Sequence, residues 1–280
     1  MTPRRTIVHP VTATGTALHA GVQVAMTLSP GTCGSGIVFR RSDLNVDIPA
    51  RYDLVSETRL GTVIGSGTAK VGVIEHLMAA AAGAEIDDLL VILDGPEPPI
   101  LDGDALSYFT LLESAGWAEQ NQPRTAIKVF RPVTVQSGDA KASLLPADRL
   151  SYSYALSFPV IGEQSYVFVF SPAGFRAEIA PARTFGFLSE LNALNKMGMA
   201  KGASLANTLA LDANGVVNRE CQRFPDEFVR HKILDAIGDM ALAGSPLVAR
   251  FEGVKSGHAT NNALLRALFA DSANYAWVDA

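Results

Sequence analysis

The stretch from Phe224 to Gly244, FPDEFVRHKILDAIGDMALAG, carries polar residue types at a spacing suited to holding a metal ion. At about 100° per residue of a helix, His231, Asp235 and Asp239 fall within roughly one quadrant. An imidazole and a carboxylate at positions i and i+4 lie on adjacent turns, so both side chains can bind one ion. The same spacing is typical of a solvated helix face, and the helix alone favours that simpler interpretation.

A second candidate is the adjacent pair Glu75 and His76, followed directly by the apolar run LMAAAA. One interpretation places both residues on the surface near a helix start, where the helix dipole favours Glu. In the other, His76 joins His231 and Asp235 as the third ligand of a zinc site with an open position. Glu75 lies about 100° around the helix from His76 and would face the water there as a base.

Two further segments carry reactive residue types. RTFGF, residues 183–187, places Thr184 before an expected helix, where threonine most often caps the helix. GVKSGHATNN, residues 253–262, places Lys255 and His258 after an expected strand. A single histidine there is more often a helix-terminus or solvent residue than a catalytic one, so neither segment establishes a site alone.

The composition narrows the class of protein. The chain has 280 residues, 48% hydrophobic and 18% charged, with a net charge of −5 and a pI near 5.5. These values favour a compact enzyme of roughly two domains, and without a basic stretch they argue against a nucleic-acid partner. Cys33 and Cys221 are too few for a disulfide framework, which favours a reducing compartment. With no signal peptide and no apolar run of spanning length, we expect a cytoplasmic protein that meets any lipid substrate at the membrane surface.

The elements that must position these residues form two series, each expected to run strands, helix, strand, helix. In the first half we expect strands between residues 6 and 48, a helix over 73–82, a strand over 89–93 and a helix after Gly103. His19 is expected near a hairpin connection. The glycine-rich stretch 61–67 predicts a hairpin connection more than a phosphate site.

The polar segment AEQNQPRT, residues 118–125, is the best candidate linker, which predicts domains over residues 1–120 and 124–272. In the second half we expect strands that include FRAEI (175–179) and a helix over 187–197. We also expect the helix that carries His231 and Asp235 to have Pro225 at its first position. A last helix over 258–270 and a loosely packed tail from Asp271 complete the chain. The fold predicted is α+β, with two layered domains facing each other.

Together these segments resemble one family, the zinc-dependent UDP-3-O-acyl-N-acetylglucosamine deacetylases of lipid A biosynthesis. The resemblance covers nearly the whole chain and rests on long motifs in order: EHL (75–77), DGPEPPILDG (94–103), ARTFGF (182–187), FPDEFVRHKILDAIGD (224–239) and KSGHATNNALL (255–265). It implies two domains of similar topology, each a mostly antiparallel sheet with two helices, with the helices packed inward between the sheets. It also implies a monomer that acts on an acylated UDP-sugar in the cytoplasm.

The resemblance also implies a role for each matching residue. His76, His231 and Asp235 would bind Zn²⁺, Glu75 would be the general base, and Thr184 would contact the oxyanion. His258 would be the charged partner that stabilises the oxyanion or protonates the amine, oriented by Asp239. The substrate contacts implied are Lys232, also placed in the catalytic group, and Lys255 at the nucleotide-sugar end, together with Phe185 at the sugar. Leu18 and His19 are further substrate contacts, and Leu191 and Ser204 belong to the acyl passage. Residues 191–204 resemble the acyl passage, although their apolar side chains are equally typical of core.

Some positions depart from the family pattern: Ala17, Ala20, Val73 and Ala203 replace its usual residues, and the loop after Phe158 is short. None of these positions is a predicted metal ligand or the predicted base, so they bear on specificity. Ala203 stands where the family commonly has glycine, and its methyl group is expected to narrow the acyl passage. One alternative is a zinc amidase acting on another N-acyl sugar or amine. The other is a catalytically silent sugar-nucleotide binding protein, but such a protein has no use for a base beside an open metal site.

Overall fold

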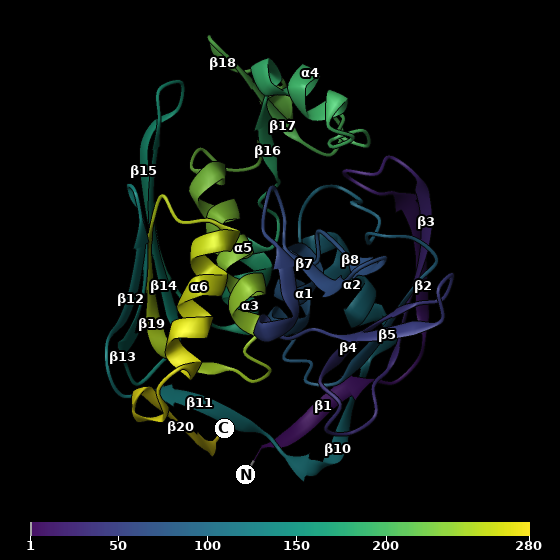
Figure 1. Cartoon of the computed structure of the whole chain (residues 1–280), viewed down its shortest axis with the longest axis vertical. Coiled ribbons are helices and arrows are strands. Elements are labelled where there is room, and N and C mark those ends of the chain that lie inside the picture. Colours follow the sequence, from purple (N-terminus) through teal and green to yellow (C-terminus); the bar gives the residue numbers. More distant parts are fainter. Residues whose placement is uncertain (1) are drawn as a thin grey trace.

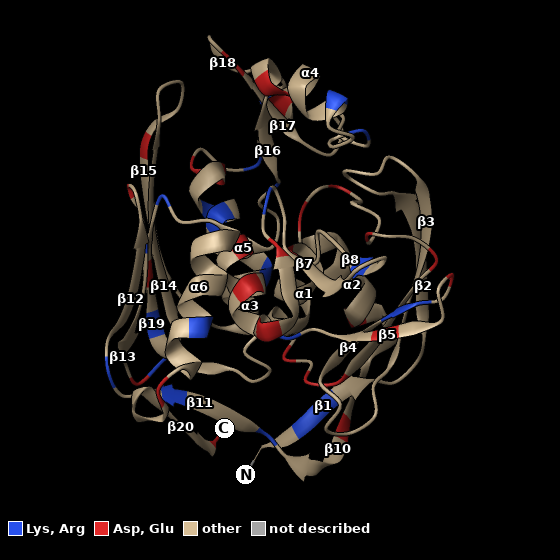
Figure 2. Cartoon of the chain, viewed as in Figure 1, with Lys and Arg blue, Asp and Glu red and all other residues tan. Residues whose placement is uncertain are grey.

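The computed structural model describes residues 2–280, which form a mixed α+β structure with six helices among the described residues. Helices α1 (Glu75–Gly83), α5 (Glu227–Ala241) and α6 (His258–Phe269) lie between two sheets (Figure 1). Acidic and basic residues are interspersed along the elements in this view (Figure 2). Within residues 2–280, no helix is both long enough and apolar enough to cross a membrane.

One sheet contains five strands in the order β2-β3-β9-β4-β5, all from the first half of the chain. Its strands show the period-two burial of a half-buried sheet: in β3, Val24, Met26 and Leu28 point into the core. Helix α2 (Leu106–Ala115) follows it in sequence. The strands of this half are β1 (Pro3–Ile7), β2 (Val11–Thr16), β3 (Gln23–Pro30), β4 (Ile37–Arg41), β5 (Val46–Pro49), β6 (Val55–Glu57), β7 (Val63–Ser66), β8 (Ala69–Val71), β9 (Leu89–Leu93) and β10 (Trp117–Pro123).

The other large sheet contains seven strands, all from the second half, with β19 at its centre. Strand β19 pairs antiparallel with β13 and parallel with β11 and β14, so the sheet is mostly but not wholly antiparallel. The strands of this half are β11 (Thr125–Val129), β12 (Val133–Ser137), β13 (Ala140–Pro146), β14 (Ser151–Phe158), β15 (Gly162–Val169), β16 (Phe185–Phe187), β17 (Leu209–Asp212), β18 (Gly215–Val216), β19 (Leu247–Val254) and β20 (Tyr275–Asp279).

A small unit projects from the end of the molecule above α5 (Figure 1). It consists of the three-stranded sheet β16-β17-β18 and helix α4 (Leu188–Lys196). No residue of α4 is fully buried, and Leu188 is 41% exposed. The segment predicted to resemble an acyl passage therefore forms a thin cover with one face toward solvent.

Helices α1 and α5 pack closely because a glycine lies between them. A Cβ atom at Gly238 of α5 would overlap the carbonyl oxygen of Glu75 in α1. Small residues at such a crossing let two helix backbones approach further than side chains would allow. This contact brings the Glu75–His76 pair of one helix alongside the His231–Asp235 pair of the other.

Four local expectations are corrected. FRAEI is not a strand but a helical turn after α3 (Pro172–Gly174), because Phe175 and Ile179 bury at helical spacing. Helix α5 starts at Glu227, so Pro225 precedes it. The segment expected as a linker forms β10, paired with β1, and then enters β11. The tail is not loosely packed, since β20 pairs with β11 over five residues and Tyr275 packs on Phe269.

Candidate functional site

Three buried side chains converge where α1 meets α5: His76, His231 and Asp235. The Oδ1 atom of Asp235 lies 3.6 Å from Nε2 of His76 and 3.4 Å from Nε2 of His231. A tetrahedral ion with ligand distances near 2.1 Å separates neighbouring ligand atoms by about 3.4 Å. Two imidazoles and one carboxylate at these separations fit a metal ion. The sequence left open whether this face of the helix is exposed to solvent or binds a metal, and in the structure the face is buried.

The protonation states of these residues also suit a metal ion. Burial lowers the pKa of His231 to about 3, so its imidazole is neutral, as metal binding requires. Burial acts to raise the pKa of Asp235, but the charge of the Lys232 ammonium beside it holds that pKa well below its usual range. The Lys232 Nζ atom donates to Oδ2 of Asp235 at 2.6 Å, which leaves Oδ1 facing the two imidazoles.

Glu75 and His258 face each other beside this cluster. The Oε1 atom of Glu75 lies 3.8 Å from Nε2 of His258, and Oε2 of Glu75 accepts a hydrogen bond from the Thr62 backbone N–H at 2.9 Å. Burial raises the pKa of Glu75. Burial acts to lower the pKa of His258, but the carboxylates of Asp239 and Glu75 outweigh it and raise this pKa to about 9. The pair therefore places a carboxylate of increased basicity beside an imidazolium.

Asp239 lies behind His258 and has both carboxylate oxygens engaged. Its Oδ2 atom accepts hydrogen bonds from Nδ1–H of His258 at 2.9 Å and from Nδ2 of Asn261 at 2.8 Å. Its Oδ1 atom accepts one from the hydroxyl of Thr62 at 2.6 Å. With Nδ1 held in this way, Nε2 of His258 is directed toward the cluster.

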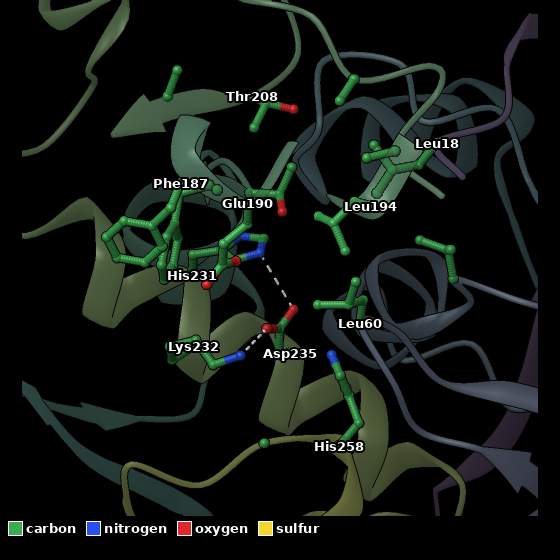
Figure 3. Close-up of a pocket in the computed structure, with 18 of the residues that line it drawn as sticks. Leu18, Leu60, Phe187, Glu190, Leu194, Thr208, His231, Lys232, Asp235 and His258 are labelled. Carbon is green, nitrogen blue, oxygen red and sulfur yellow. Dashed lines mark hydrogen bonds and ion pairs between the residues drawn. The ribbon is translucent and has the colours of Figure 1, made fainter. Parts of the chain in front are cut away.

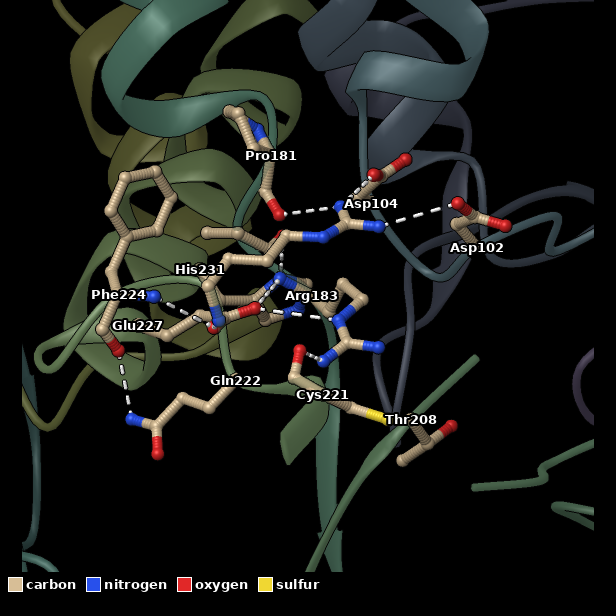
Figure 4. Close-up of polar contacts among 12 residues, drawn as sticks. Asp102, Asp104, Pro181, Arg183, Thr208, Cys221, Gln222, Phe224, Glu227 and His231 are labelled. Atoms are coloured by element: carbon tan, nitrogen blue, oxygen red, sulfur yellow. Dashed lines mark hydrogen bonds and ion pairs between the residues drawn. The ribbon is translucent and has the colours of Figure 1, made fainter. Parts of the chain in front are cut away.

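A polar network at the start of α5 fixes the orientation of His231 (Figure 4). Nδ1–H of His231 donates to the Ala182 carbonyl at 3.1 Å, so Nε2 points to Asp235. The fully buried carboxylate of Glu227 accepts from the Arg183 backbone N–H at 2.9 Å, and Arg223 donates to the Pro181 carbonyl at 2.8 Å. Arg223 also binds Asp104, a residue of the first half of the chain.

These residues lie at the base of a pocket of about 850 Å³, whose upper wall is the projecting unit (Figure 3). Apolar side chains such as Leu18, Leu60 and Leu194 surround the polar base. The site residues predicted from sequence that line this pocket are Leu18, His19, Glu75, His76, Thr184, Phe185, Leu191, Ser204, His231, Lys232, Asp235, Lys255 and His258. Asp239 is the exception and lies behind His258.

Individual positions refine this arrangement. Thr184 does not cap a helix, because it precedes β16 and its backbone pairs with Gly103 and Leu209. The Phe185 ring packs edge-on against His231 with centroids 6.0 Å apart. Lys255 lies at the exposed rim, its Nζ 3.6 Å from Asp139, while Nε2 of His19 lies 2.9 Å from the Leu60 carbonyl.

Backbone strain gathers around the pocket. Seven non-glycine residues among those described have positive φ, and four of them line the pocket: Leu60, Val73, Ala200 and Lys255. Val73, with φ of 54°, lies two residues before the start of α1, and β-branched residues strongly disfavour this conformation. Such strain persists only where surrounding contacts hold it, and it clusters at functional sites.

Sequence reasoning missed two polar residues of the site, Thr62 and Asn261, both in contact with Asp239. Asn261 follows His258 by three positions on α6, a helical spacing that was available as a signal. Thr62 lies in the glycine-rich stretch interpreted as a hairpin connection, and its neighbours in sequence give no such signal.

Comparisons with known proteins agree with this geometry. The profile of the family described as LpxC, UDP-3-O-acyl N-acetylglycosamine deacetylase, matches residues 4–270. The chain is 45% identical to the UDP-3-O-acyl-N-acetylglucosamine deacetylase of Myxococcus xanthus, over 99% of this chain and 90% of that protein. The proteins of the same name from Nautilia profundicola (46%, over 96% and 93%) and Pseudomonas entomophila (45%, over 97% and 92%) are equally similar. A match of this length and identity, joined to a buried site assembled from the family's motifs, establishes that the chain belongs to the UDP-3-O-acyl-N-acetylglucosamine deacetylase family.

Proposed function

We propose that this chain removes the N-acetyl group from UDP-3-O-acyl-N-acetylglucosamine, a step of lipid A biosynthesis. The observation that best supports this function is that His76, His231 and Asp235 converge beside Glu75 and His258 at the base of an apolar pocket. Water adds to the acetyl carbon, the carbon–nitrogen bond breaks, and the products are acetate and the 2-amino sugar nucleotide.

We propose zinc as the ion held by the three convergent residues, since two neutral imidazoles and a carboxylate are a donor set that zinc prefers. When bound, zinc would polarise the amide carbonyl and make the attacking water more acidic. The Lys232 ammonium lies against Asp235, where it keeps this carboxylate ionised and therefore able to bind. The ammonium also lines the pocket, where it would meet the polar end of the substrate.

Glu75 and His258 divide the proton transfers. Glu75 accepts a proton from the attacking water on Oε1, the oxygen that the Thr62 backbone N–H leaves free. His258 enters the reaction protonated, since its pKa is about 9, and stabilises negative charge as it develops on the substrate oxygen. The hydroxyl of Thr184 adds a donor to that oxygen. Protonation of the departing amine by His258 or by the protonated Glu75 completes the reaction.

The apolar wall of the pocket supports an acylated substrate. Leu18, Leu191 and Ser204 would surround the acyl chain, and Phe185 would pack against the sugar. Ala203 packs against Leu18 and Val73, so its added methyl narrows this part of the pocket. Lys255 at the rim would contact the nucleotide-sugar end, and His19, which also lines the pocket, would be a further substrate contact.

We also propose two domains, residues 1–120 and 124–272, with similar topology. Each large sheet takes its strands from one side of residue 124, which supports this division. A cytoplasmic location is supported by Cys33 and Cys221, which are both free thiols. The monomeric state remains a prediction from sequence.

The test is deacetylation by purified, zinc-loaded protein, measured by mass spectrometry of the products, with Glu75→Gln as the variant. Gln keeps the shape of the side chain but cannot accept the proton, so kcat should fall by about 10²- to 10⁴-fold. Zinc content should stay near that of the wild type because Glu75 is not a ligand. Full turnover by this variant would sink the mechanism.

The same assay separates the alternatives. A strong preference for acylated over non-acylated UDP-N-acetylglucosamine is expected, because only the acyl chain can use the apolar wall. Equal rates on both substrates would favour an amidase of other specificity. No turnover and no bound zinc would favour a silent binding protein.

A further inference from the structure

Thr62, which precedes β7, bonds to Glu75 and to Asp239, the partner of His258, and makes no hydrogen bond to any of the three proposed metal ligands. Its backbone N–H donates to Oε2 of Glu75 at 2.9 Å, and its hydroxyl donates to Oδ1 of Asp239 at 2.6 Å. Its carbonyl accepts from the backbone N–H of Ile74 at 3.4 Å, at the start of α1. The residue is 1% exposed, so neither bond competes with water.

The bond to Asp239 completes the set of partners of a buried carboxylate. His258 and Asn261 both bind Oδ2, and the Thr62 hydroxyl is the partner of Oδ1. Without that hydroxyl, Oδ1 would be buried without a donor, which is strongly unfavourable for a charged group. The carboxylate would then gain by turning toward another donor, and the Nδ1–H of His258 would lose its fixed acceptor.

We propose that Thr62 is a positioning residue for the deacetylation, one that aligns the Asp239–His258 pair with Glu75. The backbone bond fixes which Glu75 oxygen faces the attacking water, and the hydroxyl bond fixes the direction of His258 Nε2. Thr62 comes from the first half of the chain, whereas Asp239 and His258 come from the second. One residue therefore fixes the orientation of Glu75 relative to His258, which come from different halves of the chain.

This inference rests on the proposed function for its kinetic consequence, although its geometric consequence is independent of turnover. Thr62→Val keeps the side-chain volume and the backbone bond to Glu75 but removes the hydroxyl. We expect kcat to fall about 10- to 100-fold, the usual effect of losing a partner that orients an active-site group, with KM within about twofold. Thr62→Ser restores the hydroxyl and should restore kcat to within a fewfold of the wild type.

A second readout is the Nδ1 proton of His258, observed by NMR and assigned by its loss in His258→Gln. In the wild type, the proton should be protected from exchange with solvent because Asp239 holds it. In Thr62→Val, its resonance should broaden or disappear, and in Thr62→Ser it should return. This measurement decides the proposal even if the wild type fails to deacetylate the expected substrate, a result that would count against the function alone.

The matched control is Thr6→Val. Thr6 is also a buried threonine of the first half, and its hydroxyl accepts from the Gly31 backbone N–H at 2.9 Å, in the region of β1 and β3. Thr6→Val should lower the unfolding temperature about as much as Thr62→Val does, while leaving kcat and the His258 resonance unchanged. The proposal is overturned if Thr62→Val keeps wild-type kcat and a sharp His258 resonance, if Thr62→Ser behaves like Val, or if the loss of rate follows a loss of zinc.

Discussion

Two histidines of this site respond in opposite ways to similar burial. His231 has its pKa lowered to about 3, because desolvation of the imidazolium dominates. His258 has its pKa raised to about 9, because the carboxylates of Asp239 and Glu75 overcome the same desolvation. Neighbouring charges thus leave one imidazole neutral, as its proposed metal binding requires, and keep the other charged, as its proposed electrostatic role requires.

The charged state of His258 can be measured in the metal-free protein. We expect an NMR titration of its ring to give a midpoint near 9, and Asp239→Asn to lower that midpoint because burial remains while the main raising charge is gone. The folded-state pKa lies above the unfolded value of about 6.5. The charged pair therefore contributes stability that is fully present below about pH 6.5 and is lost as the pH rises through about 9.

Unfolding free energies of the wild type and His258→Gln, compared across this range of pH, provide the control. Their difference should shrink toward alkaline pH. A titration midpoint below neutral pH, or a difference that grows with pH, would contradict the assigned charge.

Among the elements, the contact of α1 with α5 matters most for the site. Each helix supplies part of the proposed ligand set, so the separation of their axes sets the distance from His76 to Asp235. Gly238 permits this separation, since any side chain there would overlap the Glu75 carbonyl. Gly238, which lies in the motif between Asp235 and Asp239, is therefore small because the two helices pack closely there.

Gly238→Ala should separate the two helices. The substitution gains about 1 kcal/mol of helix propensity, but overpacking at a close contact typically costs about 1–3 kcal/mol. A displacement of about 1 Å at the site can reduce the rate by about 100-fold. We therefore expect a lower unfolding temperature together with a large loss of kcat, measured on zinc-supplemented protein.

Gly72→Ala is the control for a glycine substitution near the site. A Cβ there meets only ordinary contacts at 3.4 Å or more, so activity and stability should stay close to those of the wild type. If Gly238→Ala retained wild-type kcat, the close approach of the helices would not be a requirement of the site.

At the scale of the whole molecule, the site joins the two halves of the chain. His76 and Glu75 come from the first half, whereas His231 and Asp235 come from the second. The Arg223–Asp104 ion pair links the same halves beside the start of α5 (Figure 4). Metal bound between α1 and α5 should therefore stabilise the association of both halves as well as supply chemistry.

Removal of the metal should lower the unfolding temperature of the whole chain. At free zinc a hundredfold above the dissociation constant, binding contributes about 2.7 kcal/mol to the folded state. A chelator should remove this contribution in the wild type, as measured by calorimetry with and without added zinc. His76→Ala lacks one proposed ligand and should show little response to the chelator or to added zinc, whereas an equal response in both proteins would place the metal elsewhere.

The sequence was sufficient for the family, the reaction and the polar residues at the base of the pocket. The long motifs carried this information, because a metal ion and a base require particular residue types at particular spacings along a helix. Most helix positions followed from hydrophobic periodicity, as for residues 258–270. The prediction of a strand for FRAEI was wrong because five residues of mixed polarity fit a strand and a helical turn equally well. The prediction of a loosely packed tail was wrong because β20 depends on a partner strand about 150 residues earlier.

The folded chain supplied the relations between residues that are far apart in sequence. That His231 and Asp235 are buried rather than solvated depends on α1, which packs against them from the other half. Thr62 shows the limit most clearly, because its role comes from contact with Asp239, 177 positions later. Local spacing fixes which groups one helix can present together, whereas the partners of a buried carboxylate are set by packing between elements, to which no short stretch of sequence gives access.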